Sequence, residues 1–151
     1  MAADLVERLA AIVGARWLVR DLDGLEEYGH DATFMESAPL CAVRPASTEE
    51  VAAVVREAAG AGVPVVARGA GTSLVGGPVP MAAGVVLSLD RLTSLEIDAP
   101  NTVAVVGAGV ITAALDAAAA GHGLMYPPDP ASYEMSTIGV NVACNSGACA
   151  A

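Results

Sequence analysis

A strand–helix–strand pattern over residues 41–67 constrains the fold of this chain more than any other feature of its sequence. Cys41–Arg44 predicts a short strand that ends before Pro45, because proline disfavours helix at the residue before it. A capping box begins at Ser47, and the apolar residues after it recur at helical spacing. Val63–Ala67 then predicts a buried strand. Two strands joined by one helix are parallel and have a right-handed crossover.

The remaining patterns predict short helices and strands on both sides of this unit. Asp4 begins another capping box and predicts a helix that ends before Gly14. The acidic segment Asp21–Glu36 has no periodicity, so we expect it to run irregularly over the surface. Further strands are predicted over residues 84–89, 94–98 and 102–106, and a further helix over Thr112–Ala120. No internal repeat is present, and the fold class is α/β or α+β.

The connection after the second strand of the strand–helix–strand unit is rich in glycine and free of acidic residues. Between Glu57 and Asp90 the only charged residue is Arg68, although the whole chain has 17 acids, seven arginines and a net charge of −10. A loop of this kind at the carboxyl end of a parallel strand can direct successive backbone N–H groups toward an anion. The residues that favour this interpretation are Arg68, Gly69, Gly71, Thr72, Ser73, Gly76 and Gly77. The alternative is a connection that only turns tightly.

This glycine-rich loop differs from the two commonest nucleotide-binding loops. The chain has no lysine, which excludes the P-loop of nucleoside triphosphatases. The pattern G-x-G-x-x-G fails because Leu74 stands where the third glycine belongs, and Pro78 prevents the helix that would carry a pyrophosphate. A second near-match, Gly107-Ala108-Gly109, has Thr112 at the third glycine position, so we interpret it as a turn between a strand and a helix.

The C-terminal part of the chain combines rigid and neutral polar residues. Prolines at positions 127, 128 and 130 predict a stiff, extended loop. Neutral hydrogen-bonding residues follow at Ser132, Ser136, Thr137, Asn141 and Asn145. Such groups on a rigid loop suit a flat heteroaromatic ligand with carbonyls and ring nitrogens, such as a flavin. A polar surface loop is the alternative.

Composition argues against several classes of partner. The net charge of −10 and the scarcity of aromatic residues, at 3%, disfavour nucleic acid and anionic lipid surfaces. Three cysteines without metal-ligand spacing predict a reduced, cytoplasmic protein without a metal. We expect no secretory signal, because the N-terminus carries Asp4 and Glu7 and has no apolar region of the kind that signal peptides need. We expect no transmembrane segment, because glycine or proline interrupts every long uncharged stretch.

Three ordered motifs carry a resemblance to a known family. They are Pro45–Val51, Val65–Leu74 and Tyr126–Ser132, the last followed by Ser136–Gly139. Together they resemble the N-terminal part of FAD-linked oxidases of the vanillyl-alcohol oxidase superfamily, which have a PCMH-type FAD-binding domain. Within that superfamily the chain is similar to the glycolate oxidase FAD-linked subunit and to FAD-dependent D-lactate dehydrogenases.

The resemblance implies an α+β fold of two lobes with FAD between them. It implies an N-terminal helix and acidic lead-in over residues 1–37 and a FAD-binding domain over residues 38–151, with the first lobe complete and the second truncated. One set of residues matches the loop around the FAD diphosphate: Val66, Ala67, Arg68, Gly69, Ala70, Gly71, Thr72, Ser73, Gly76 and Gly77. A second set matches the surroundings of the flavin and ribityl chain: Pro128, Asp129, Ser132, Thr137, Ile138, Gly139 and Asn141.

The resemblance also implies a reaction and shows departures from the family pattern. The implied reaction is hydride transfer from a small 2-hydroxy acid to the flavin, with the substrate held by a C-terminal domain and a possible redox partner subunit. Val140 replaces a second glycine that the family usually has after Gly139, and the sequence stops at Ala151, before the part that supplies the catalytic base. We therefore expect an inactive fragment without catalytic residues. The alternative is a non-enzymatic remnant or interaction module that keeps the fold without functional FAD.

Overall fold

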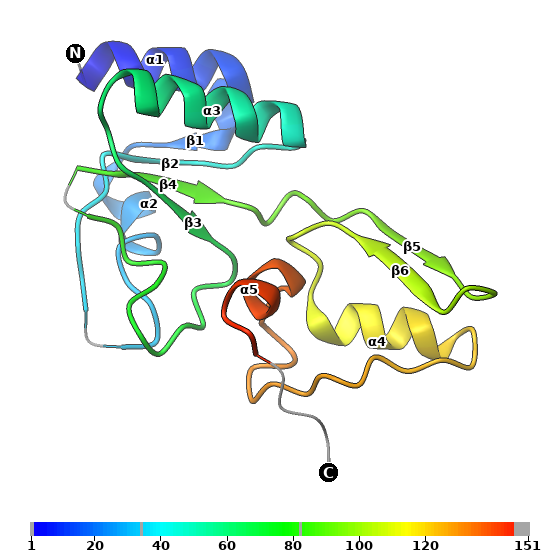
Figure 1. The fold of residues 1–151 in the computed structure, drawn as a ribbon. Coiled ribbons are helices and arrows are strands. Elements are labelled where there is room, and N and C mark those ends of the chain that lie inside the picture. Colours follow the sequence, from blue (N-terminus) through cyan, green and yellow to red (C-terminus); the bar gives the residue numbers. More distant parts are fainter. Residues whose placement is uncertain (1, 34, 82, 147–151) are drawn as a thin grey trace. The chain divides into compact units, whose positions relative to one another are not determined.

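The computed structural model describes residues 2–33, 35–81 and 83–146 (Figure 1). The chain forms two compact units, Met1–Arg91 and Leu92–Ala151. Each unit has its own hydrophobic core, and each is described by itself below. No helix in the described ranges is long and apolar enough to cross a membrane.

The first unit is built on a four-stranded sheet. Its strands are β1 (Leu18–Val19), β2 (Cys41–Val43), β3 (Val65–Arg68) and β4 (Val85–Ser88). Their order is β1-β2-β4-β3, with β1 antiparallel to β2 and the other pairs parallel. The strand–helix–strand prediction is confirmed in its elements and strand direction, but β2 and β3 are not neighbours. Strand β4 lies between them and pairs with both. The prediction that the second strand is buried is wrong, because β3 is an edge strand in which only Arg68 is buried.

Helices cover both faces of this sheet. Helices α1 (Ala2–Val13) and α3 (Thr48–Gly60) pack together on one face, as Figure 1 shows. Because successive strand residues point to opposite faces, alternate residues of β2 and β4 reach the α1–α3 side. The buried residues there are Leu5, Val6, Leu9, Val13, Cys41, Val43, Val54, Val85 and Leu87. Ala42 and Val86 instead pack against Leu25 and Tyr28.

The two capping boxes have different outcomes. Ser47 caps α3, and its hydroxyl accepts a hydrogen bond from the Glu50 N–H at 3.2 Å. The Glu50 carboxylate accepts from Ala46 N–H at 2.7 Å, one residue before the expected partner. The prediction of a cap at Asp4 is wrong, because α1 begins at Ala2 and Asp4 lies inside it, where it pairs with Arg8. An exposed carboxylate one turn from a guanidinium is a typical helix-surface pair.

The prediction for the acidic segment Asp21–Glu36 is wrong in part: most of its described residues are exposed, but the segment contains a helix and several buried residues. Residues Leu22–Glu26 form helix α2, after a short 3-10 helix at Ala15–Trp17 that leads into β1. The Asp21 carboxylate caps α2 by accepting from Gly24 N–H at 2.8 Å. Tyr28 and Asp31 are buried as well. The helix is too short to show a periodic pattern, and its burial depends on the sheet beneath it.

The second unit is a β-hairpin with two helices. Strands β5 (Leu95–Asp98) and β6 (Val103–Val106) are antiparallel, and helix α4 spans Thr112–Ala120 as predicted. Helix α5 (Ile138–Ala143) was not predicted. Its six residues include glycine, asparagine and two valines, all weak helix formers, so its stability depends on packing in the fold.

Candidate functional site

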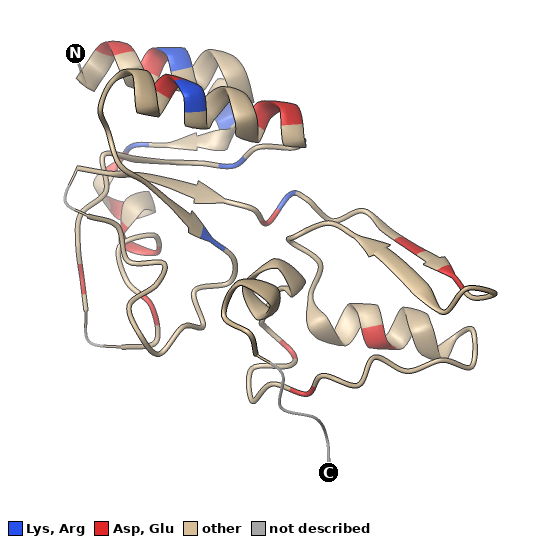
Figure 2. Ribbon diagram, viewed as in Figure 1, with Lys and Arg blue, Asp and Glu red and all other residues tan. Residues whose placement is uncertain are grey.

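The carboxyl ends of the three parallel strands form a basic edge. Arg44 follows β2, Arg68 ends β3, and Arg91 lies just beyond β4, next to Asp90. Figure 2 shows that the basic residues all lie in the first unit. In a chain with a net charge of −10, this concentration of positive charge makes the edge favourable for an anion. Ligands of open parallel sheets commonly bind at such an edge.

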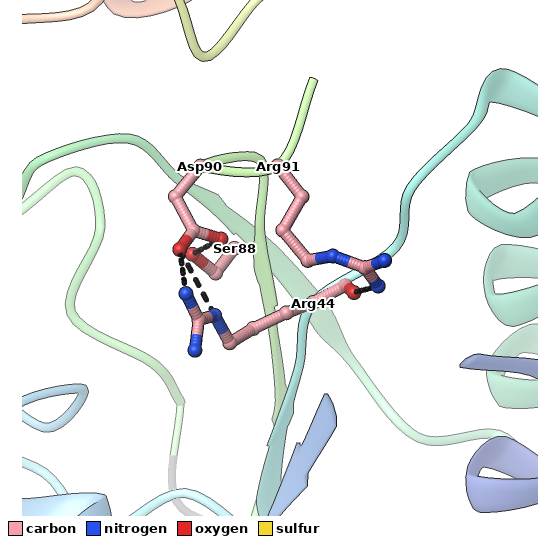
Figure 3. A network of polar contacts seen from close by, with 4 residues as sticks. All are labelled: Arg44, Ser88, Asp90 and Arg91. Atoms are coloured by element: carbon pink, nitrogen blue, oxygen red, sulfur yellow. Dashed lines mark hydrogen bonds and ion pairs between the residues drawn. The ribbon is translucent and has the colours of Figure 1, made fainter. Parts of the chain in front are cut away.

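A polar network stabilises one side of the basic edge (Figure 3). Arg44 donates from two nitrogens to one oxygen of Asp90, and the Nε distance is 2.9 Å. Ser88 donates to the other oxygen at 2.9 Å, and Arg91 donates to the Arg44 carbonyl at 2.8 Å. Burial alone would raise the pKa of Asp90, but the bonds from Arg44 and Ser88 hold it below its ordinary value. Arg91 also lies 3.8 Å from the centre of the Trp17 ring.

Arg68 lies at the other side of the edge and points into the protein. Its side chain is 6% exposed, and its guanidinium donates to the His30 carbonyl at 2.5 Å. The same group lies 5.9 Å from the centre of the Tyr28 ring and fills the space beside Gly71, where a Cβ would overlap it. Arg68 therefore supports the glycine-rich loop from beneath and keeps a positive charge there. The two residues before Arg68 in β3, which were also predicted to bind the diphosphate, differ in burial: Val66 packs against the core, and Ala67 is exposed.

The glycine-rich loop exposes a run of backbone donors. Across the described ranges, none of the six N–H groups of residues 69–74 donates a hydrogen bond. Gly71 has a φ of +72°, so the chain turns here in a conformation that favours glycine. The next donors are used internally, with Val75 N–H bonded to the Ser73 hydroxyl at 3.2 Å and Gly76 N–H bonded to Asp31 at 2.9 Å. Six unpaired amides above a buried cation fit an anionic group such as a diphosphate.

Asp31 is the residue that sequence analysis missed at this loop. It is only 7% exposed, although it belongs to the segment expected on the surface. Burial alone would raise the pKa of Asp31, but hydrogen bonds from Thr33, Gly76 and Ser73 lower it. The signal in the sequence is the short spacing between Asp31 and Thr33, which is typical of a turn closed by a carboxylate. It predicts a local turn but gives no indication of the distant partner Gly76.

In the second unit, the predicted flavin-side residues lie around a buried polar network. The Thr112 hydroxyl contacts the Ser136 carbonyl at 3.0 Å, and the Asn141 amide donates to that hydroxyl at 2.7 Å. Thr112, Ser136, Thr137 and Asn141 are each at most 4% exposed. The Asn141 amide nitrogen is therefore used inside the unit. Within the described residues the Thr137 hydroxyl has no hydrogen-bond partner, so it remains a donor for a ligand.

Ile138 and Gly139 have structural roles in the same region. Ile138 is a buried core residue beside Leu115, and both line a cavity of about 380 Å³. Gly139 lies against Ala108, and its N–H donates to the Ala108 carbonyl at 3.0 Å. A Cβ on Gly139 would lie 2.7 Å from the Ala108 Cβ and 2.9 Å from the Ala108 carbonyl oxygen. A side chain at position 139 is therefore excluded by Ala108 of the same unit, without any bound ligand.

Replacement of Gly139 by alanine is expected to destabilise the second unit by about 2 kcal/mol, because an overpacked contact must open. Thermal and urea unfolding of the 151-residue chain would measure this change. Ala108→Gly should recover part of the loss in the double variant, since it removes the nearer of the two atoms. Equal stability of Gly139→Ala and the parent would contradict the close packing.

The proline-rich loop is tied to α4 through Asp116. Its carboxylate accepts from the Tyr126 N–H at 2.9 Å and from the Tyr133 hydroxyl at 2.8 Å. Pro128 is half-buried, Asp129 is exposed and half-buried Ser132 accepts a backbone bond from the Ser136 N–H. The structure thus brings the tail residues together within the second unit and the loop residues 66–77 together within the first.

Comparisons with known proteins identify relatives over most of the chain. The profile of the "FAD binding domain" family matches residues 39–151. A D-lactate dehydrogenase of Archaeoglobus fulgidus is 45% identical over 123 residues, which are 76% of this chain and 28% of that protein. The glycolate oxidase subunit GlcD of Bacillus subtilis is 38% identical over 146 residues, 95% of this chain and 31% of that protein. The chain thus spans less than a third of the length of either relative.

Solved structures agree in fold. Alkyldihydroxyacetonephosphate synthase has a TM-score of 0.85 at 23% identity, over 93% of this chain and 29% of that chain. p-Cresol methylhydroxylase has a TM-score of 0.82 at 22% identity, over 93% of this chain and 28% of that chain. The family match confirms the prediction that the cofactor is FAD, and the neighbours confirm the α+β fold. The chain belongs to the FAD binding domain family and has the PCMH-type fold of the vanillyl-alcohol oxidase superfamily.

Proposed function

We propose that this chain is the FAD-holding part of an oxidoreductase that oxidises a small 2-hydroxy acid, such as glycolate or D-lactate. The observation that carries the proposal is the run of six unpaired N–H groups over residues 69–74. Backbone donors of this kind bind a diphosphate without carrying a charge that would need burial. The relatives named D-lactate dehydrogenase and glycolate oxidase subunit support the class of substrate.

In this proposal each set of residues has a separate task. Residues 66–73 with Gly76 and Gly77 bind the diphosphate, and the charge of buried Arg68 compensates part of its negative charge. Pro128, Asp129 and Ser132 lie near the flavin, and the free hydroxyl of Thr137 donates to it. Ile138, Gly139 and Asn141 lie in α5 and support that surface through their packing and hydrogen bonds inside the second unit. When bound, FAD supplies an acceptor for two electrons and a proton.

The rest of the proposed reaction needs groups beyond those of this chain. A 2-hydroxy acid needs a positioned base for its hydroxyl proton and cations for its carboxylate. Arg44 is bonded to Asp90, Arg68 to the His30 carbonyl, and residues 92–151 contain neither lysine nor arginine. We propose that a further domain of the whole protein supplies these groups, and that a redox partner subunit receives the electrons.

Two measurements on the 151-residue chain test the proposal together. Titration with FAD should give saturable binding, followed by flavin fluorescence, while the same chain with FAD and a dye acceptor should not oxidise glycolate or D-lactate. Failure to bind FAD at any concentration up to about 1 mM would contradict the proposal, since weaker binding is of the order of non-specific contact. Turnover on the order of 1 s⁻¹ would show that the chain has its own catalytic base and substrate cations.

Val140→Gly is expected to strengthen FAD binding several-fold. Val140 is half-buried in α5 beside Gly139, and removing its side chain restores the paired glycines that the family usually has. Glycine within a helix lowers stability by about 1 kcal/mol, so affinity and unfolding must be measured separately. Unchanged or weaker binding of FAD by the glycine variant would show that Val140 does not limit the approach of the flavin.

A further inference from the structure

Asp31 joins the acidic lead-in to the glycine-rich loop through one buried carboxylate. One oxygen accepts from the Gly76 N–H at 2.9 Å. The other accepts from the Thr33 N–H at 2.9 Å and from the Thr33 hydroxyl at 2.6 Å. A buried carboxylate with both oxygens used is a strong and directional acceptor, so its position defines that of the Gly76 amide.

Two neighbouring bonds connect the same segment to the start and the middle of the loop. The His30 carbonyl accepts from the Arg68 guanidinium at 2.5 Å, where β3 ends. The Ala32 N–H donates to the Ser73 carbonyl at 3.1 Å. Residues 30–32 therefore contact the loop at Arg68, at Ser73 and at Gly76. Since residues 69–74 donate no bond to the described part of the chain, these contacts are the main restraint on the loop.

We infer that Asp31 is a positioning residue that holds the glycine-rich loop in the form that presents its free amides to a diphosphate. This inference rests on the proposed function for its purpose, but not for the contacts themselves. A neutral amide could not replace the carboxylate, because its NH₂ group would face either the Gly76 or the Thr33 donor. The negative charge of Asp31 is held by donors from Thr33 and Gly76 and lies near buried Arg68, which reduces its repulsion of an anion.

Asp31→Asn is the variant that separates this role from others. It keeps the size of the side chain and removes one acceptor and the charge. The matched control is Asp23→Asn, because Asp23 is exposed in α2 and undergoes the same change of charge. Hydrogen exchange of the loop amides without ligand measures the restraint, and titrations with FAD and riboflavin measure its consequence. Riboflavin shares the flavin ring but has no diphosphate.

In Asp31→Asn the Gly76 amide should exchange at least about tenfold faster, and FAD affinity should fall about tenfold as the competent form becomes less populated. Riboflavin affinity and the control variant should stay at parent values. Parent-like exchange of residues 69–77 in Asp31→Asn would overturn the inference, and so would equal losses for FAD and riboflavin. If the parent chain binds no FAD, the proposed function fails, and the exchange data alone decide whether Asp31 holds the loop.

A second variant covers the case in which Asp31→Asn does not fold. Thr33→Val removes the hydroxyl donor to Asp31 and leaves the Gly76 bond in place. Thr33→Val should also speed the exchange of the Gly76 amide and lower the affinity for FAD, but by smaller factors than Asp31→Asn. Parent-like values for both would overturn the inference.

Discussion

Replacing Ala70 by aspartate is expected to weaken the binding of FAD by about a hundredfold. Ala70 is exposed, lies within the run of unpaired amides and has an ordinary backbone conformation, so the new side chain fits without strain. Its carboxylate would compete for the N–H groups and repel a diphosphate by about 3 kcal/mol at the separation of neighbouring loop groups. Calorimetric titration with FAD at low and high salt would measure the loss, which should shrink as salt rises.

Ala70→Asn is the matched control, because it has the same shape without the charge. It should bind FAD within about threefold of the parent chain. The position matters: at Gly71 the same substitution would meet the Arg68 guanidinium and a φ of +72°, so loss of binding there would mix repulsion with strain. Equal FAD affinity of Ala70→Asp and Ala70→Asn would show that the loop does not face an anion.

Gly107→Ala should be the most destabilising of the single substitutions considered for the second unit, at about 3 kcal/mol. A Cβ on Gly107 would lie 2.6 Å from the Leu92 carbonyl carbon and 3.2 Å from the Ser94 nitrogen, both of them backbone atoms. The contact is closed by the bond from Gly107 N–H to the Ser94 carbonyl at 2.7 Å. Backbone cannot rotate away as a side chain can, so the turn must open. Chemical unfolding followed by circular dichroism would measure the change.

Gly60→Ala provides the comparison for Gly107→Ala. Gly60 is the last residue of α3, and nothing lies within 4 Å of the position that its Cβ would take. Alanine there should be neutral or stabilise by up to about 1 kcal/mol, because it is the better helix former. A loss of similar size in both variants would indicate that glycine is needed for reasons other than the close backbone approach at Gly107.

Elements with local signals could be predicted from the sequence. Helix α3 has a serine cap and helical spacing, and α4 begins at Thr112 and ends at Ala120, as expected. The arrangement of strands could not be predicted in this way, because hydrophobic pattern does not say which strands are neighbours. Strand β4 lies between β2 and β3 through contacts that join residues far apart in the chain. Helices α2 and α5 are too short for a periodic signal and depend on tertiary packing.

In the candidate site, too, features with a local signal could be predicted and features that depend on tertiary contacts could not. The absence of acids around Arg68 in the sequence predicts an anion-binding loop, and in the described part of the chain the amides of residues 69–74 donate no hydrogen bond. The direction of the Arg68 side chain could not be predicted, since its partner is the carbonyl of distant His30. Gly139 illustrates a further limit. The motif assigns it to the flavin, whereas its closest neighbour is Ala108 of the same unit. A glycine in a sequence shows that space is needed but not what occupies it.

The glycine-rich loop is also the covalent connection between β3 and β4, and this gives it a part in folding. Strand β4 pairs with β2 and β3 only after residues 69–84 have closed into a loop, which costs chain entropy. A ligand that orders the loop lowers this cost and binds only the folded form. FAD should therefore raise the melting temperature of the first unit in proportion to the logarithm of its concentration. The supply of the cofactor would then govern how much of the protein reaches and keeps its native sheet.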